Sequence, residues 1–174
     1  YPTPESRRPP RESDLPRVAT APHLEDSRRR GHFAGVALVV ARLFSLVRPS
    51  VAVFGEKDWQ QLQVVSAMVR EPERFGTPAV EIVAGATVRE GDGLAMSSRN
   101  RFLSVDERRR AGAIRLALDE AGRCPDADEG ERVMDAALRA AGIEPDYAVV
   151  RDARTLERDG PVKCGVLRAG DAGR

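Results

Sequence analysis

A short continuous apolar run, Val51–Phe54, stands between two segments of helical periodicity and narrows the possible folds more than any other feature. Four consecutive apolar residues are typical of a strand that is buried on both faces of a parallel sheet. A second strand is expected at Ala79–Val83, after the second helical segment. Helix, strand, helix and strand in this order predict a right-handed parallel crossover. We therefore expect an α/β fold for this part of the chain.

Each helical segment carries one apolar stripe, which predicts one buried face. The first segment covers residues 33–47 and ends before Pro49, which cannot continue a helix. The second segment begins at Asp58. The stripes consist of Val36, Val40, Leu43, Phe44 and Val47 in the first segment and of Leu62, Val65 and Val69 in the second.

Residues 85–103 form a glycine-rich stretch, which we expect to be a loop. The pattern after this loop predicts an α+β arrangement. Ser104 and Glu107 have the spacing of a capping box, which predicts a helix with Ala111, Ile114, Leu118 and Ala121 facing inward. A further helix is expected from about Glu129 to Ala141, before Gly142. Strands are expected at 147–150 and 162–167. These patterns predict a domain boundary near residue 86, with one domain at 1–86 and a smaller one at 87–174.

The first 31 residues are rich in Pro and Arg, so we expect an arm or loop there. The run Arg28–Arg30 is compatible with a phosphate-binding patch or with a solvated loop. The chain begins with Tyr1, which is compatible with a fragment, a processed product or an incomplete gene. These alternatives remain open at the level of sequence.

Composition limits the possible partners and the cellular compartment. The net charge is +1, from 28 basic and 27 acidic residues, which argues against a nucleic-acid or anionic-membrane partner. No apolar run approaches the roughly 20 residues of a membrane span. Cys124 and Cys164 lack metal-ligand spacing, and the polar N-terminus does not look like a signal peptide, so we expect a cytoplasmic protein.

A polar turn, Gly55–Asp58, follows the first predicted strand directly. Ligands of open α/β sheets bind at the carboxyl ends of strands. Gly55 allows the backbone to approach a ligand, and Lys57 can reach a phosphate as a mobile charge. Asp58 and Gln61 have two readings: they contact a ligand, or they cap the second helix. A solvated Lys57 is the alternative for the lysine.

The segment Met96–Asn100 offers two hydroxyl groups and a guanidinium in three consecutive positions. Such donors suit the charge that develops on pyrophosphate, although a polar turn has the same composition. The sequence contains neither a P-loop nor a dinucleotide-binding glycine fingerprint. His32 has no nucleophile partner in the sequence pattern, and we expect its side chain to pack near the start of the first helix.

Three segments, Arg30–Val36, Phe54–Gln61 and Thr87–Leu103, closely resemble the pantothenate synthetase (pantoate–β-alanine ligase) family, and the likeness extends over residues 22–152. The resemblance implies the C-terminal part of a Rossmann-like nucleotidyltransferase parallel sheet, followed by a small α+β domain. It also implies ATP-dependent condensation of pantoate with β-alanine to pantothenate, a coenzyme A precursor. The reaction proceeds through a pantoyl-adenylate and releases AMP and pyrophosphate.

The resemblance also implies roles for individual residues. Lys57, Ser97, Ser98 and Arg99 are the expected catalytic residues, and Gln61 is expected to hold pantoate. Mg²⁺ is expected to accompany ATP without a protein ligand that we can name, and a homodimer is expected. The implied ATP-binding residues are Gly55, Glu56, Lys57, Asp58, Val88, Met96, Ser97, Ser98 and Arg99.

The chain departs from the family pattern at its beginning. The family's His-x-Gly-His loop, first strands and first pantoate-binding glutamine have no counterpart in this sequence. We therefore expect the 174-residue chain to be inactive by itself and the edge of its first strand to be exposed. The alternative function is a non-catalytic remnant that acts only in nucleotide binding or dimerisation.

Overall fold

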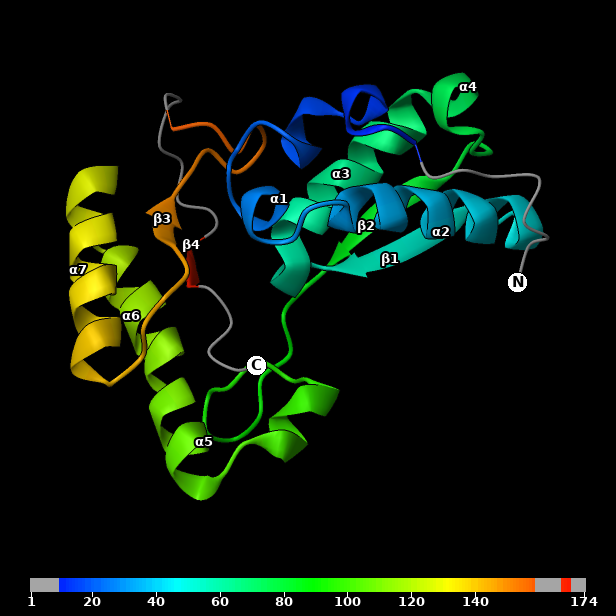
Figure 1. The fold of residues 1–174 in the computed structure, drawn as a ribbon. Coiled ribbons are helices and arrows are strands. Elements are labelled where there is room, and N and C mark those ends of the chain that lie inside the picture. The colour runs from blue at the N-terminus through cyan, green and yellow to red at the C-terminus, as the bar shows by residue number, and fades with distance from the viewer. Residues whose placement is uncertain (1–9, 159–166, 170–174) are drawn as a thin grey trace. The chain divides into compact units, whose positions relative to one another are not determined.

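Strand β1, Val51–Gly55, pairs in parallel with β2, Glu81–Gly85, in the computed structural model (Figure 1). Their register runs from Val51 opposite Glu81 to Gly55 opposite Gly85. The structure describes residues 10–158 and 167–169, the last three by their backbone alone. The parallel pairing confirms the α/β fold expected for this part of the chain, and β2 lies two residues later than predicted.

The chain divides into two compact units, Tyr1–Ala86 and Thr87–Arg174. The functions expected for the two parts of the chain remain predictions. Beside the two strands, the described part of the first unit contains helices α1 to α4 and three 3₁₀ turns. The helices are α1 (Glu25–Arg28), α2 (His32–Val47), α3 (Trp59–Arg70) and α4 (Pro72–Phe75), and the turns are η1 (Glu12–Asp14), η2 (Arg17–Ala19) and η3 (Glu56–Asp58).

Helices α2 and α3 supply the core under one face of the sheet. Val40, Phe44 and Val65 are buried there, and Ala52 and Phe54 of β1 pack against them. The alternate β1 residue Val53 is 68% exposed. The prediction that β1 is buried on both faces is therefore wrong for the described residues. Successive side chains of a strand point to opposite faces of the sheet. The α2 and α3 residues of this cluster pack against Ala52 and Phe54, which lie on one face.

The α2 stripe differs in part from the predicted one. Val40 and Phe44 are buried, whereas Leu43 and Val47 are exposed. Small residues that the pattern overlooked, Ala34 and Ala37, complete the buried line. The α3 stripe is confirmed, with Leu62 and Val65 buried and Val69 partly buried.

The segment before α1 is not a free arm over its described part. Leu15 and Ala19 are buried in one cluster with Phe33 of α2 and with Val64 and Met68 of α3. Burial of these two apolar side chains fixes this Pro-rich stretch on the helices. The prediction of an arm or loop is thus wrong for residues 10–28, which form turns and a short helix on the core.

Over residues 87–158 and 167–169, the second unit contains helices and one small antiparallel sheet. Its capping box is confirmed: Oγ of Ser104 accepts from the Glu107 N–H at 3.3 Å, and the Glu107 carboxylate accepts from the Ser104 N–H at 2.8 Å. The single helix predicted after Ser104 is divided at Gly112, whose N–H is shared between two carbonyl groups. The helices are α5 (Val105–Ala111), α6 (Ala113–Ala121) and α7 (Ala127–Ala140), preceded by a 3₁₀ turn, η4 (Ser98–Phe102).

Strand β3, Ala148–Val150, pairs antiparallel with β4, Leu167–Ala169. The predicted strand at 162–167 falls outside the described residues except for Leu167, and so does Cys164. Met134 and Leu138 of α7 are buried against α6 and form the core of this unit. Among the helices of the described ranges, none is both long enough and apolar enough to cross a membrane.

Candidate active site

The first group of predicted site residues lies where β1 ends and α3 begins. Gly55 is the last residue of β1, the turn η3 holds Glu56, Lys57 and Asp58, and α3 starts at the next residue. Glu56 and Asp58 are exposed, and Lys57 is half-buried. A side-chain Cβ at Gly55 would meet no atom within 4 Å, so the end of this strand is open at that position. The arrangement places a cation and free space at the carboxyl end of a parallel strand, where anionic ligands bind in such sheets.

The capping alternative for Asp58 and Gln61 is wrong. Asp58 occupies the N-cap position of α3, but its side chain makes no capping hydrogen bond. The amide groups in the first turn of a helix carry a partial positive charge, which favours an anion at this end. The first-turn amide groups of α3 therefore have no side-chain cap from Asp58.

Gln60, which the sequence analysis did not single out, is the buried glutamine of this region. Its side chain is 2% exposed. Oε1 accepts from the Glu25 N–H at 3.0 Å, and Nε2 donates to the Val18 carbonyl and to Oδ1 of Asp26, both at 2.9 Å. Its position was detectable, because residues 60, 64 and 68 share one face of α3. Gln61, the predicted pantoate residue, is half-buried at the next helical position.

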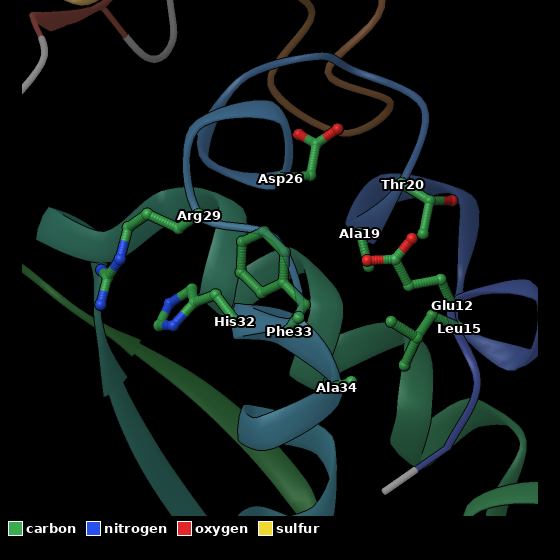
Figure 2. A pocket seen from close by; sticks show the side chains of 10 residues that line it. Glu12, Leu15, Ala19, Thr20, Asp26, Arg29, His32, Phe33 and Ala34 are labelled. Atoms are coloured by element: carbon green, nitrogen blue, oxygen red, sulfur yellow. The ribbon is translucent and has the colours of Figure 1, made fainter.

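A small pocket that is open to solvent lies in the first unit beside the start of α2 (Figure 2). None of the predicted site residues lines it. Asp26 at its rim is engaged by Gln60 and by the N–H groups of His23 and Leu24. The pocket is lined by Glu12, Leu15, Ala19, Thr20, Asp26, Arg29, Gly31, His32, Phe33 and Ala34.

His32 begins α2 and packs as expected near the helix start. Its ring centroid lies 5.0 Å from that of Phe33, at an interplanar angle of 53°. Burial lowers the pKa of His32, and the charge of Arg29 lowers it further, while Glu25 and Asp58 oppose the shift. The imidazole is therefore biased towards its neutral form at neutral pH.

The second group of predicted residues lies in the second unit. Residues Arg89 and Ala95 form an antiparallel bridge, and the Met96 N–H donates to the Val88 carbonyl at 2.9 Å. The structure therefore brings together Val88 and Met96, and both side chains are exposed. The predicted glycine-rich loop is a short hairpin at this point.

The serines and the arginine follow this hairpin. Ser97 is the N-cap of η4, and its Oγ accepts from the Arg99 N–H at 3.3 Å. Ser98 and Arg99 are exposed in the first turn of η4, and Ser97 is half-buried. Lys57 belongs to the first unit, and the Ser97–Arg99 group belongs to the second unit. Within the described ranges, no cluster of three or more His, Cys, Asp or Glu side chains is suited to a metal ion.

Comparison with known proteins identifies the family. The sequence matches the family described as pantoate-beta-alanine ligase over residues 2–171. Pantothenate synthetase of Anaeromyxobacter dehalogenans (strain 2CP-C) is 51% identical over 138 residues, which are 76% of this chain and 46% of the relative. Pantothenate synthetase of Thiobacillus denitrificans (strain ATCC 25259 / T1) is 50% identical over 151 residues, with coverage of 83% and 51%. The chain thus spans about half the length of the curated relatives it matches.

Solved structures agree. Pantothenate synthetase from Thermus thermophilus superposes with a TM-score of 0.71 at 43% identity, covering 86% of this chain and 55% of that chain. The pantoate-beta-alanine ligase from Francisella tularensis, complexed with beta-gamma ATP and beta-alanine, gives a TM-score of 0.55 at 27% identity, with coverage of 70% and 44%. These likenesses support the expected α/β nucleotidyltransferase type of fold. The chain belongs to the pantoate–β-alanine ligase family.

Proposed function

We propose that this chain contributes to the ATP-dependent condensation of pantoate with β-alanine, which yields pantothenate, AMP and pyrophosphate. The observation that carries the proposal is the family match over residues 2–171, together with a cationic turn at the carboxyl end of a parallel strand. The Francisella relative, complexed with beta-gamma ATP and beta-alanine, supports the choice of substrates.

The reaction needs activation of a carboxylate, which is a poor electrophile. A carboxylate oxygen of pantoate attacks the α-phosphorus of ATP, the bond to the bridging oxygen breaks, and pyrophosphate leaves. The amine of β-alanine then attacks the acyl carbon of the pantoyl-adenylate, loses a proton and displaces AMP. Both steps require that anions be held together and that developing negative charge be stabilised.

The proposed roles follow from residue type and placement. Lys57 meets the phosphates as a point charge at the open end of β1, and Gln61 binds pantoate through its amide. Ser97, Ser98 and Arg99 receive the developing pyrophosphate charge through hydroxyl and guanidinium donors. The nucleotide is further lined by Gly55, Glu56, Asp58, Val88 and Met96.

ATP enters this proposal as its Mg²⁺ complex, with the ion held by the phosphates. The described residues offer no cluster that fits a protein-bound Mg²⁺, which prefers several oxygen ligands in octahedral geometry.

Pantoate-dependent exchange between ATP and labelled pyrophosphate tests the proposal. The 174-residue chain is assayed alone and after addition of a polypeptide that comprises the other half of the Anaeromyxobacter relative. Exchange in either reaction, but not with the added polypeptide alone, supports the function. Absence of exchange in both reactions contradicts it.

A nucleotide-binding or dimerising protein without catalysis is the second candidate. ATP binding in calorimetry without exchange would favour this candidate. A homodimer and a cytoplasmic location are also proposals, and light scattering of the purified chain tests the homodimer.

A further inference from the structure

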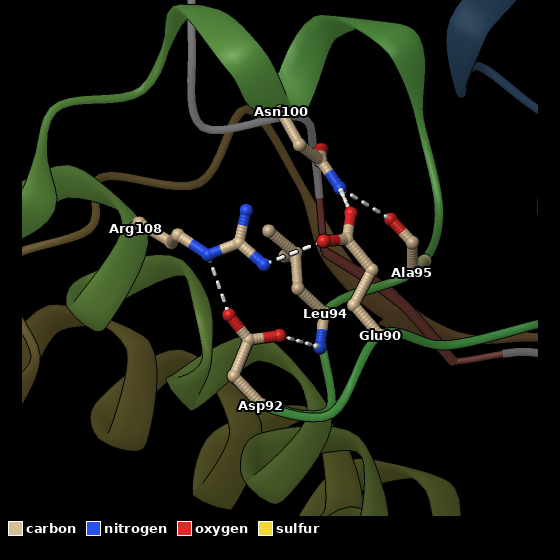
Figure 3. A network of polar contacts seen from close by, with 6 residues as sticks. All are labelled: Glu90, Asp92, Leu94, Ala95, Asn100 and Arg108. Carbon is tan, nitrogen blue, oxygen red and sulfur yellow. Dashed lines mark hydrogen bonds and ion pairs between the residues drawn. The ribbon is translucent and has the colours of Figure 1, made fainter.

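Arg108 of α5 binds two carboxylates of the hairpin that precedes the Met96–Arg99 segment (Figure 3). Its Nε donates to Oδ2 of Asp92, and one terminal nitrogen donates to Oε2 of Glu90, each at 2.6 Å. One planar guanidinium therefore joins two anions that lie two residues apart in the chain. Such fork-like donation is specific to arginine, because a lysine ammonium is a single point.

The second oxygen of Glu90 extends the network to η4. Oε1 of Glu90 accepts from Nδ2 of Asn100 at 2.5 Å, and the same amide group donates to the Ala95 carbonyl at 3.0 Å. Ala95 and Asn100 lie on either side of the Met96–Arg99 segment. The Asn100 side chain consequently closes this segment into a loop and links it, through Glu90, to Arg108.

The hairpin itself is held by short-range hydrogen bonds. The Gly93 N–H donates to the Glu90 carbonyl at 2.9 Å, and the Glu90 N–H donates to the Leu94 carbonyl at 2.8 Å. Oδ1 of Asp92 accepts from the Leu94 N–H at 3.1 Å. Gly93 has φ of +85°, a value that suits glycine. The two carboxylates are thus presented to Arg108 by a turn with a defined shape.

Arg108 lies on helix α5, whose start is also fixed by hydrogen bonds. The Ser104 capping box fixes the start of α5, and Arg108 follows one helical turn later. A single ion pair at the surface contributes little to the stability of a protein, but a network of several charges with good geometry contributes more. The Arg108 side chain is 35% exposed, and its partners bond to the backbone or to Asn100 as well. Hydrogen bonds to the ionised form lower the pKa of Glu90, with that from Arg108 first and that from Asn100 second.

We propose that Arg108 is a positioning residue, which holds the Met96–Arg99 segment ready for phosphate groups through Glu90, Asp92 and Asn100. This inference rests on the proposed function of Ser97, Ser98 and Arg99. The hydrogen bonds of Arg108 go to Glu90 and Asp92, and Glu90 in turn holds Asn100, which closes the loop that carries these three side chains. It also neutralises carboxylates beside a segment whose task is to receive an anion, so that the loop is ordered before nucleotide arrives.

The test compares Arg108→Met, Arg108→Lys and the control Arg109→Met in the full 174-residue chain. Arg109 is the neighbouring arginine of α5, and its ion pair with Asp106 is highly exposed. Amide hydrogen exchange is followed in peptides covering residues 94–103, and thermal melting is recorded in parallel. Arg108→Met is expected to accelerate exchange in this region by about tenfold or more, because charge-assisted hydrogen bonds are lost. Arg108→Lys should retain part of the protection, and Arg109→Met should retain all of it.

A second readout distinguishes positioning from general stability. Titration with Mg²⁺-ATP should show weaker binding by Arg108→Met at an unchanged melting temperature, and partial recovery in Arg108→Lys. Unchanged exchange in Arg108→Met overturns the positioning role, whether or not ATP binds. If the unsubstituted chain binds no ATP either alone or with the added polypeptide of the exchange assay, while Arg108→Met still loosens residues 94–103, the nucleotide function is refuted and the ordering role of Arg108 is supported.

Discussion

Gln60 and Gln61 are adjacent residues of one type with different surroundings. Gln60 is buried and makes three hydrogen bonds to the segment 18–26, whereas Gln61 is half-buried at the predicted pantoate position. Successive residues of a helix point about 100° apart, so one glutamine can serve the fold while the next one stays available to a ligand.

Gln60→Ala is expected to destabilise the first unit by about 1–3 kcal/mol, because it leaves the Glu25 N–H and the Val18 carbonyl without their partner. Urea unfolding followed by circular dichroism measures the change. Gln63→Ala, on the half-buried side of the same helix, is the matched control and should differ little from the unsubstituted chain. Equal effects of the two substitutions would refute the structural role of Gln60.

Lys57→Ala is expected to slow pantoate-dependent adenylate formation by on the order of 10²-fold, because a preorganised charge on the phosphates is lost. The exchange assay of the complemented protein measures this rate. Arg70→Ala removes an exposed cation from the other end of α3 and serves as control. Equal rates for both variants would exclude a phosphate role for Lys57.

The sequence predicts phosphate contacts for the Gly55–Asp58 turn and for the Met96–Arg99 segment, and these roles remain predictions. It could not reveal Gln60 or Arg108 as network residues. Their partners lie 34 to 42 and 16 to 18 positions away, and only the folded chain brings them together. The periodicity of α3 was the one available sign that Gln60 is buried.

The carboxylates of the Arg108 network should show a defined pH dependence. The pKa of Glu90 lies below its ordinary value of 4.5, chiefly because of Arg108, and that of Asp92 lies below 3.8, chiefly because of the Leu94 N–H. A lowered folded-state pKa means that the stabilisation is complete above the ordinary value and is lost as the pH falls through the folded one. The NMR signals of the Asn100 side-chain amide should therefore stay constant from neutral pH to about 5 and shift only below about 4.5. A transition near pH 6 would contradict this assignment.

Helix α7 approaches its neighbours closely at Gly130. A Cβ at this position would meet the Ala121 carbonyl oxygen at 3.2 Å and Cγ2 of Val150 at 3.3 Å. The absence of a side chain thus allows α7 to lie against both the end of α6 and strand β3. Gly35 in α2 provides the contrast, since a Cβ there would meet no atom within 4 Å.

Gly130→Ala and Gly35→Ala are expected to have opposite signs. Gly35→Ala should stabilise the chain by roughly 0.5–1 kcal/mol through helix propensity. Gly130→Ala should destabilise it by about 1–3 kcal/mol, because backbone atoms must move to admit the methyl group. Thermal and urea unfolding of the two variants measure both changes, and stabilisation by Gly130→Ala would show that the packing is looser than described.

At the level of elements, local signals in the sequence were the most reliable. The capping box of Ser104 and Glu107 and the left-handed Gly142 after α7 correspond to observed helix ends. The division between α5 and α6 at Gly112 was not predicted, because the apolar spacing continues across it. Periodicity reports which face is buried, and it does not report whether the backbone hydrogen bonds are continuous.

Across the whole molecule, one face of the β1–β2 sheet carries exposed apolar side chains, namely Val51, Val53 and Val83. Sequence predicted the parallel sheet but not this face. Four consecutive apolar residues predict that both faces of the strand are buried. The pattern does not show which part of the protein covers each face. Exposed apolar patches on a strand favour association with other apolar surfaces.

Val53→Thr is expected to reduce the binding of a fluorescent apolar dye, with little change in stability, since threonine keeps the strand preference of a β-branched side chain. Dye fluorescence and light scattering at high protein concentration measure the effect. The control Val65→Thr places a hydroxyl in a fully buried position and should cost about 1–3 kcal/mol. Unchanged dye binding by Val53→Thr would show that this face is covered in solution.

The parallel pairing of β1 with β2 has a consequence for the order of folding. The two strands can meet only after residues 56–80, including α3, have closed into a loop, and such closure carries an entropic cost. Helices α6 and α7 are joined by residues 122–126 alone and pack through contacts that are near in sequence. Local contacts form faster than distant ones. In a refolding experiment, the helical pair of the second unit therefore acquires its native contacts before the sheet of the first unit does.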